Sequence, residues 1–105
     1  RFFDGVKNLA ETSNVIILLD GDRNSIYSGL KQRDFNKPVN ILFDELGALL
    51  KDIPRVDVVD LHNIFQSDWA SNNAKFNYDY DYHWNERGHA VAARALRDKI
   101  NDLRF

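Results

Sequence analysis

The spacing of apolar residues divides the chain into three helical and two strand segments. Apolar residues recur at intervals of three and four in three segments, which predicts helices over residues 2–11, 39–52 and 86–102. Two short segments, Val15–Leu19 and Val56–Asp60, are instead β-branched and largely apolar without a helical period. Such segments are typical of parallel strands buried on both faces. We therefore expect these strands to be adjacent and parallel.

The order helix, strand, helix, strand, loop, helix is typical of α/β proteins. The polar and aromatic stretch 66–82 is expected to be a loop, although a third strand within 74–82 would extend the sheet. Two parallel strands are few for a free-standing sheet, which indicates that the chain belongs to a larger unit. The apolar faces predict a core of Ile16, Leu18, Leu42, Leu46, Leu49, Val58, Ala93, Leu96 and Ile100.

Composition indicates one small folded domain over residues 1–105. Of these residues, 44% are apolar and 29% are charged, which is ordinary for a soluble folded chain. Fourteen basic and sixteen acidic residues give a net charge of −2, so we expect no nucleic-acid partner. The sequence has no cluster of Lys and Arg, so we expect no contact with a membrane surface. The absence of cysteine excludes disulfides and thiolate metal sites.

The chain contains no methionine and begins with Arg1. A natural reading frame starts with Met, so we expect a piece of a longer protein. The longest apolar run, Val15–Leu19, is too short to span a bilayer, and no signal peptide is visible. Any targeting segment would lie upstream, which leaves the compartment open.

The densest chemistry lies in residues 79–89, at the start of the last predicted helix, where two aspartates and two histidines gather. An Asp two residues before a His can accept a hydrogen bond from the imidazole Nδ1–H. This bond fixes the tautomer and leaves Nε2 free as a general base. Asp81 and His83 are therefore candidate catalytic residues. In the alternative interpretation they belong to a polar loop whose acids favour the start of the helix through its dipole.

The same region carries a longer block: Asp81-x-His83-Trp84-Asn85-x-x-Gly88-His89, then Ala92, Ala93 and Leu96. This block resembles the last block of SGNH/GDSL-type hydrolases, in which the catalytic Asp and His precede the C-terminal helix. The Asp-x-His-Trp-Asn form is most similar to the alginate O-acetyltransferase-like branch. The commoner esterase form is Asp-x-x-His, and Tyr80 holds the position that such an Asp would need. The resemblance therefore places the acid at Asp81.

Two weaker matches follow the same order. Residues 22–27 resemble the segment after the family's fourth strand, where a basic residue precedes an aliphatic–Tyr pair, and residues 56–61 resemble its fifth strand. The resemblance spans roughly residues 14–97. It implies a three-layer α/β/α fold of flavodoxin-like type. This chain would be its C-terminal portion, a partial unit with two parallel strands and three helices.

The nucleophile of that family, a Ser in a Gly-Asp-Ser motif after the first strand, cannot be placed here. Residues 21–23 read Gly-Asp-Arg, with Arg where Ser is required. Ser25 and Ser28 come nearest, at the carboxyl edge of the first predicted strand, but neither sits in a nucleophile turn. The resemblance implies an esterase or O-acetyltransferase in which an upstream Ser attacks, His83 is the base and Asp81 orients it. The chain alone is expected to be inactive.

The resemblance also implies an acylated small molecule or carbohydrate as substrate, with no cofactor and no metal. The upstream part of the same protein would be the partner that supplies the nucleophile. Trp84, Asn85 and Arg23 are candidate substrate-binding residues. The resemblance favours a secreted or periplasmic location.

Three other interpretations stay open. Asp20-x-Asp22 after an apolar strand is similar to the motif of haloacid-dehalogenase-type phosphotransferases, or it is a turn whose carboxylates cap backbone amides. The acids and histidines of residues 79–89 would suit a divalent metal. The third interpretation is a non-catalytic binding or interaction module of the same architecture. A nucleophilic Ser upstream would distinguish an enzyme from such a module.

Two further features have ordinary structural interpretations. His62, after the second strand, is expected to be a hydrogen-bonded loop residue, and His89 a helix-face residue near His83. Five Trp and Tyr residues fall within the predicted loop or just after it, where packing on the core is favoured over carbohydrate binding. They are Trp69, Tyr78, Tyr80, Tyr82 and Trp84.

Overall fold

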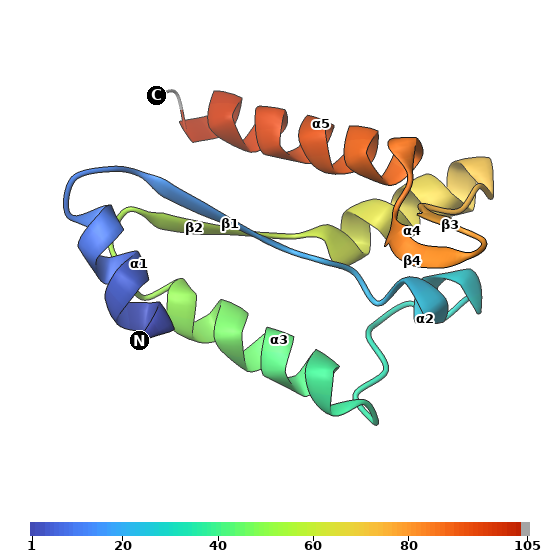
Figure 1. Ribbon diagram of the computed structural model, residues 1–105, viewed down its shortest axis with the longest axis horizontal. Coiled ribbons are helices and arrows are strands. Elements are labelled where there is room, and N and C mark those ends of the chain that lie inside the picture. Colours follow the sequence, from blue (N-terminus) through green and yellow to red (C-terminus); the bar gives the residue numbers. More distant parts are fainter. Residues whose placement is uncertain (104–105) are drawn as a thin grey trace.

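Five helices and two small sheets form a mixed α/β fold in the computed structural model, which describes residues 1–103 (Figure 1). The helices are α1 (Phe2–Ala10), α2 (Arg23–Tyr27), α3 (Pro38–Leu50), α4 (Leu61–Asn72) and α5 (Glu86–Leu103). The strands are β1 (Val15–Leu19), β2 (Val56–Asp60), β3 (Asn77–Tyr78) and β4 (Asp81–Trp84). Within this part of the chain, no helix has the length and apolar character needed to cross a membrane.

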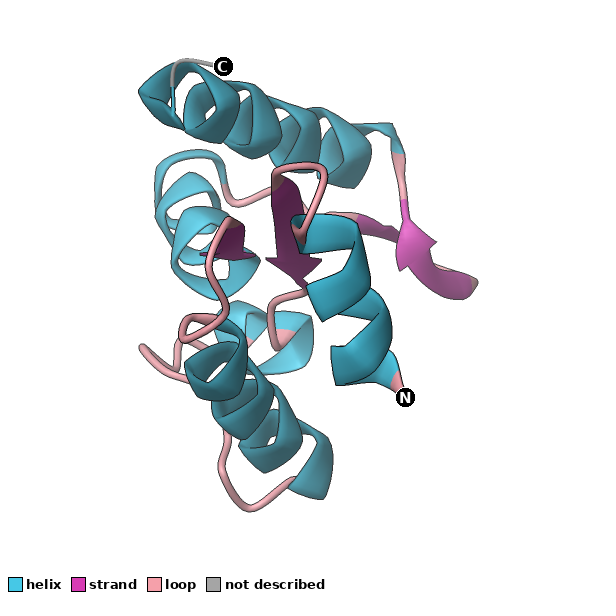
Figure 2. Ribbon diagram, turned by 90° about the vertical axis from the view of Figure 1, so that its left-hand side faces the viewer, coloured by secondary structure: helices cyan, strands magenta, loops and turns pink. Residues whose placement is uncertain are grey.

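The two predicted strands pair in parallel, which confirms the expectation. The register runs from Val15 opposite Val56 to Leu19 opposite Asp60. Figure 1 shows α1 and α3 on one side of this pair and α5 on the other, with α4 and the short hairpin of β3 and β4 where the strands end. In Figure 2 the hairpin lies to one side, apart from β1 and β2.

Successive side chains of β1 point to opposite faces, so the strand contributes to two separate cores. Val15 and Ile17 pack against a cluster between the strands, α1 and α3, which contains Val6, Ala10, Leu50, Ile53 and Val56. Ile16 and Leu18 pack against the second cluster, which contains Ile26, Val59, Leu61, Phe65, Phe76, Val91, Ala92 and Ala95. The second cluster lies beside the hairpin and therefore supports it.

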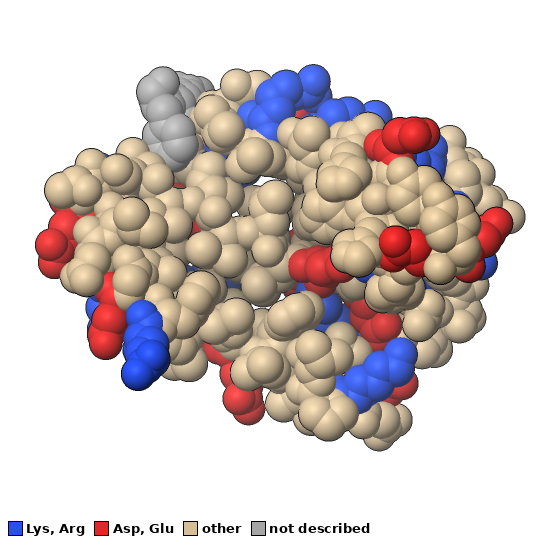
Figure 3. All heavy atoms as spheres, viewed as in Figure 1, with Lys and Arg blue, Asp and Glu red and all other residues tan. Residues whose placement is uncertain are grey.

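The other edge of β1 is unpaired among residues 1–103. Four of its five apolar residues are consequently only half-buried. Figure 3 shows a hollow near the centre of one face, bordered mainly by side chains that are neither basic nor acidic. An apolar parallel strand with one open edge is unusual, because such strands are normally covered on both faces and paired on both sides.

Part of the predicted core is wrong. On α3, Leu42 and Leu49 are 57% and 56% exposed, because the helix turns Gly47 and Leu50 toward the strands instead. A Cβ at Gly47 would lie 3.3 Å from Leu19 Cδ1, so the absence of a side chain allows this close approach. Leu46 is half-buried at the edge of that face, as is Val58 on β2.

The buried face of α5 also differs from the predicted one. Ala93 and Ile100 are exposed and Leu96 is half-buried, while Gly88, Val91, Ala92 and Ala95 face the core. At Gly88 a Cβ would lie 2.5 Å from the Phe76 carbonyl oxygen. This contact with the hairpin rotates the helix away from the face that hydropathy favours.

The predicted loop over residues 66–82 is wrong in both halves. Its first half completes α4, which Asp60 caps by accepting a hydrogen bond from the His62 N–H at 3.0 Å. Asn73 ends this helix in the left-handed conformation, with a φ of 51°. The second half forms β3 and β4, which make their own sheet instead of extending β1 and β2. The Asn and Ser residues that suggested a loop lie at the end of α4.

Candidate active site

The expected contact between Asp81 and His83 is present on β4. Asp81 Oδ1 lies 2.5 Å from His83 Nδ1 and accepts a second hydrogen bond, of 2.9 Å, from the His83 N–H. The backbone N–H and the imidazole together hold the pKa of the Asp81 carboxyl below its ordinary value. With Nδ1–H donated to Asp81, Nε2 carries the free lone pair. The catalytic role of this pair stays a prediction.

His83 borders a pocket of about 320 Å³ just beyond the carboxyl end of β1. The residues that line it are Asp20, Arg23, Tyr82, His83, Trp84 and His89. The His83 side chain is 89% exposed, so its imidazole is open to solvent at the rim. This is the edge at which open α/β sheets place their ligands.

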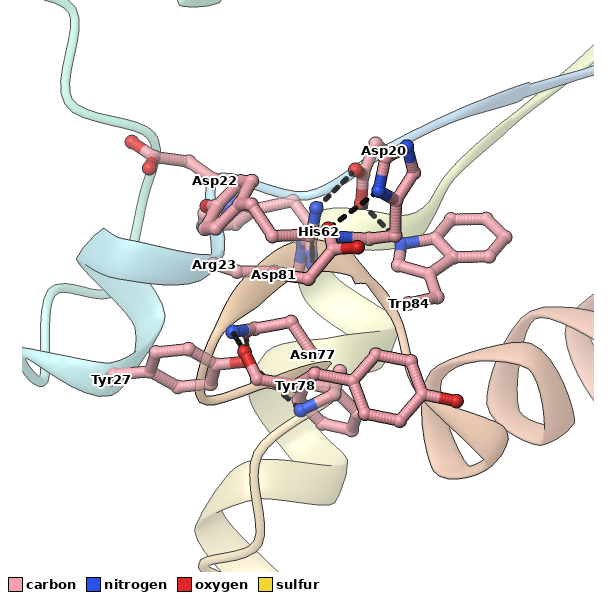
Figure 4. Close-up of polar contacts among 12 residues, drawn as sticks. Asp20, Asp22, Arg23, Tyr27, His62, Asn77, Tyr78, Asp81 and Trp84 are labelled. Carbon is pink, nitrogen blue, oxygen red and sulfur yellow. Dashed lines mark hydrogen bonds and ion pairs between the residues drawn. The ribbon is translucent and has the colours of Figure 1, made fainter.

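Arg23, a candidate substrate-binding residue, is buried and contacts other residues of the protein. It is 4% exposed, and its Nη1 donates a 2.7 Å hydrogen bond to the Tyr82 carbonyl oxygen. Its Nη2 contacts Asp20 Oδ2 at 3.2 Å, and its guanidinium lies 4.0 Å from the centre of the Tyr82 ring. The other Asp20 oxygen accepts a 3.2 Å hydrogen bond from Trp84 Nε1 (Figure 4).

Tyr27 forms a second attachment between α2 and the hairpin. Its hydroxyl donates a 2.6 Å hydrogen bond to Asn77 Oδ1 and accepts one of 2.9 Å from the Phe76 N–H. Burial raises the pKa of this phenol, so it stays protonated and able to donate. Figure 4 shows Tyr27 and Asn77 meeting below the Arg23 contacts.

Asn85 and His89 have structural contacts at the start of α5. Asn85 Oδ1 accepts a 2.9 Å hydrogen bond from the Gly88 N–H, and its amide nitrogen donates to the carbonyls of Lys75 and Asn77. The His89 ring meets the Trp84 indole edge-on, with centroids 5.4 Å apart. Of the three substrate-binding candidates, Trp84 combines a place in the pocket wall with half-burial.

Neither nearby serine is paired with His83. The Ser25 hydroxyl is buried and donates to Asp22 Oδ2 at 2.6 Å, and that of Ser28 donates to the Asn24 carbonyl oxygen. Across residues 1–103, no serine hydroxyl is hydrogen-bonded to the imidazole of His83. The structure thus brings together an imidazole and a carboxylate, but no serine hydroxyl bonded to that imidazole within this part of the chain.

Asp22 is the centre of a buried polar network at the same edge. Besides Ser25, its carboxylate accepts hydrogen bonds from the Asn40 amide at 2.8 Å and the Asp34 N–H at 3.0 Å, and Lys37 lies 3.6 Å away. Burial by itself raises the pKa of Asp22, but the hydrogen bonds and Lys37 outweigh it and lower the pKa to about 2.

These contacts weaken the phosphotransferase interpretation. Asp22 caps α2 by accepting from the Ser25 N–H, as in the turn interpretation, and Asp20 is engaged by Arg23 and Trp84. Both carboxylates therefore already have donors where a magnesium ion would be needed. The metal interpretation of residues 79–89 has no geometric support either, because no three His, Asp or Glu side chains among residues 1–103 are grouped to hold a metal ion.

His62 lies on α4 and is 3% exposed, so it is not the loop residue that was expected. Its Nδ1 accepts a 3.0 Å hydrogen bond from the Asp22 N–H, which places the proton of the neutral ring on Nε2. Burial, and then the Arg33 charge, lower the pKa of His62. Arg33 itself donates to the Asp20 carbonyl oxygen at 2.7 Å and contacts Asp60 at 2.6 Å.

The aromatic residues divide between packing and exposure. Trp69 and Trp84 pack against the second core, as expected. Tyr80, in contrast, is 86% exposed and stacks on Tyr78 with centroids 5.4 Å apart. Tyr78 lies opposite Asp81 in the hairpin, so this tyrosine pair sits beside the Asp–His pair.

Sequence reasoning missed the roles of Tyr27 and Asn40. Arg23 and Tyr27 are four residues apart, which places both on one face of a helix, and this spacing was the available signal. Asn40 offered none, because it joins Asp22 only through the tertiary fold.

Comparison with models of protein families, with curated proteins and with solved structures found no match to this chain.

Proposed function

We propose that this chain is the C-terminal part of an SGNH/GDSL-type domain that hydrolyses or transfers ester acyl groups. His83 acts as the general base and Asp81 orients it. The observation that carries the proposal is the 2.5 Å contact between Asp81 Oδ1 and His83 Nδ1 at the rim of the pocket. This contact holds the ring in the tautomer whose Nε2 can accept a proton.

The proposed reaction follows from that tautomer. A serine hydroxyl from an upstream segment attacks the ester carbonyl carbon while His83 Nε2 takes its proton. The bond from carbonyl carbon to the leaving alcohol then breaks, and the imidazolium returns the proton to that alcohol. Water or a second alcohol releases the acyl group from the serine by the same steps. In both halves of the reaction the Asp81 carboxylate stabilises the imidazolium by accepting the hydrogen bond from the His83 Nδ1–H.

The open edge of β1 supports the finer fold, a three-layer α/β/α sheet of flavodoxin-like type. The unpaired edge, the half-buried strand residues and the hollow beside them are what a further parallel strand would cover. Exposed Leu42 and Leu49 on α3 fit the same interpretation, since their spacing predicts burial. The remaining strands, with the nucleophile and the oxyanion donors, would come from the upstream part of the protein.

The decisive experiment uses a longer form of the protein that contains this chain, assayed with p-nitrophenyl acetate and with acetylated saccharides. We expect His83→Ala to abolish turnover and Asp81→Asn to lower kcat by about 10³–10⁴, because the orienting acid is lost. Asp79→Asn is the matched control, since Asp79 is exposed on the same hairpin. The 105-residue chain alone should turn over the ester no faster than free imidazole. Unchanged kcat in Asp81→Asn would contradict the proposal.

A specific observation favours one second candidate, a non-catalytic binding module. The exposed Tyr80 stacks on Tyr78, which lies opposite Asp81 in the same hairpin, and no serine is hydrogen-bonded to the His83 imidazole within residues 1–103. Such a module would bind its ligand equally well with His83→Ala and would lose affinity with Tyr80→Ala. In an enzyme, by contrast, His83→Ala should lower turnover more than Tyr80→Ala does.

A further inference from the structure

We propose that α2 is the element that positions the catalytic pair, with Arg23 and Tyr27 as positioning residues. This inference rests on the proposed function for the meaning of the pair. It gives Arg23 a positioning role in place of the expected role in substrate binding. The structural claim, that α2 fixes the hairpin to the carboxyl end of β1, can be tested without any activity.

The Asp81–His83 contact does not by itself place the pair on the molecule. The two residues are two positions apart on one strand, so their hydrogen bonds are local and need no contact with the rest of the fold. The His83 side chain is largely solvent-exposed and that of Asp81 is partly so, which leaves little packing to hold them. General base catalysis requires the imidazole to lie within hydrogen-bond reach of the nucleophile. The position of β4 must therefore come from contacts made by its neighbours.

Arg23 supplies those contacts on both sides of His83. Its guanidinium holds the carbonyl of Tyr82, the residue before His83. Through Asp20 it is linked to the indole of Trp84, the residue after His83. The planar fork of an arginine can serve two partners in fixed directions, whereas a lysine offers a single point charge.

Tyr27 holds the other strand of the hairpin from the same helix face. Its hydroxyl bonds to the Asn77 side chain on β3 and to the Phe76 N–H directly before it. The hairpin needs this support, because β3 and β4 pair at only two positions and the register shifts between them. One five-residue helix thus attaches both strands to the end of β1.

The burial of Arg23 fits a positioning role better than a purely stabilising one. Its Nε is buried without a hydrogen-bond partner, which is costly for a charged group. Buried ion pairs are often no more stabilising than apolar residues of similar size. An arginine kept at this site is explained by the directions in which it holds Tyr82 and Asp20.

The test uses the 105-residue chain and nuclear magnetic resonance. The chain has no cysteine, so Asn24→Cys, at an exposed position of α2, gives one site for a spin label. In this background we expect strong paramagnetic broadening of the amide signals of residues 81–84. Arg23→Gln should reduce the broadening and speed amide exchange at these residues about tenfold, the ratio for one lost hydrogen bond. The Val91 amide should be unchanged, and Arg23→Lys should not restore the broadening at residues 81–84.

Arg97→Gln on α5 is the matched control and should leave β4 unaffected. If Arg23→Gln does not fold, Tyr27→Phe removes one oxygen and carries the test, with the same expected loss of broadening. Unchanged broadening and exchange at residues 81–84 in the folded variants would overturn the inference.

A kinetic arm separates this inference from the proposed function. In the longer protein, Arg23→Gln should lower kcat about 10–100-fold with KM within about twofold, because the substitution misplaces the base while Arg23 itself does not contact substrate. A raised KM with unchanged kcat would show that Arg23 binds substrate and would overturn the positioning role. If the wild-type protein has no acyl-transfer activity, the proposed function fails, while the resonance measurements still decide whether α2 positions the hairpin.

Discussion

Asp22→Asn should be among the most destabilising isosteric substitutions in this chain. Asp22 is 8% exposed, and its carboxylate accepts hydrogen bonds from the Ser25 hydroxyl, the Asn40 amide and the Asp34 N–H. An asparagine keeps the shape of the side chain but replaces one acceptor oxygen with a donor. Whichever way the amide turns, an N–H group faces one of the buried donors.

The pKa of Asp22 gives the size of the charge effect. The fall from 3.8 to about 2 means that the native contacts favour the carboxylate by about 2 kcal/mol, at about 1.4 kcal/mol for each pH unit. Leaving a buried donor unsatisfied adds about 1–3 kcal/mol. We therefore expect Asp22→Asn to lower the free energy of unfolding by about 3–5 kcal/mol at pH 7, a large share of the 5–15 kcal/mol typical of a domain.

The assay is urea unfolding followed by tryptophan fluorescence. Asp44→Asn on α3 is the control, since this exposed carboxylate should change stability by less than about 0.5 kcal/mol. The pH dependence checks the cause. Because the native pKa is depressed, the stabilisation is present above pH 3.8 and is lost as pH falls toward about 2. The gap between wild type and variant should narrow over that window. A loss below about 1 kcal/mol at pH 7 would refute the reasoning.

Two further predictions concern the buried imidazole and the close approach of α5 to the hairpin. Because the pKa of His62 is lowered below 6.5, its stabilisation is complete above pH 6.5 and declines as pH falls below it. Urea unfolding should show the free energy of unfolding falling by at most about 1.4 kcal/mol per pH unit in that range. This fall should vanish in His62→Gln but persist in His89→Gln. Gly88→Ala should cost about 1–3 kcal/mol in thermal unfolding, because its Cβ would meet the Phe76 carbonyl. Gly5→Ala, with open space around it, should be neutral or stabilising.

The polar network at the carboxyl edge explains why these effects should be large in a small domain. The buried polar residues are concentrated there: Asp22, Arg23, Ser25, Arg33, Asn40 and His62. They join the segments after β1 and β2 to the start of α3 by hydrogen bonds that span many residues. Since partly satisfied buried networks are expensive, each member depends on the others. Loss of one member therefore leaves its buried partners unsatisfied, at the edge where the proposed reaction places its base.

Sequence pattern by itself determined the features that depend on near neighbours. The unbroken apolar stretch of Val15–Leu19 predicted a strand, because no polar position marks a solvent face. Intervals of three and four predicted the positions of α3 and α5 to within two residues. The contact between Asp81 and His83 was also predictable, because it spans two positions of one strand and needs no distant partner.

Only the tertiary structure decided which faces are buried and what holds the candidate site. Leu42 and Leu49 have helical spacing, yet both are exposed. The small residue Gly47 lets α3 approach β1 closely, so the face that carries Gly47 turns toward the strands instead. The roles of Arg23 and Tyr27 depend on partners about fifty to sixty residues away, at Tyr82 and Asn77. Hydropathy records how much each side chain gains from burial, but not which side chains meet. That depends on how closely helices and strands can approach, which is decided when the whole chain packs.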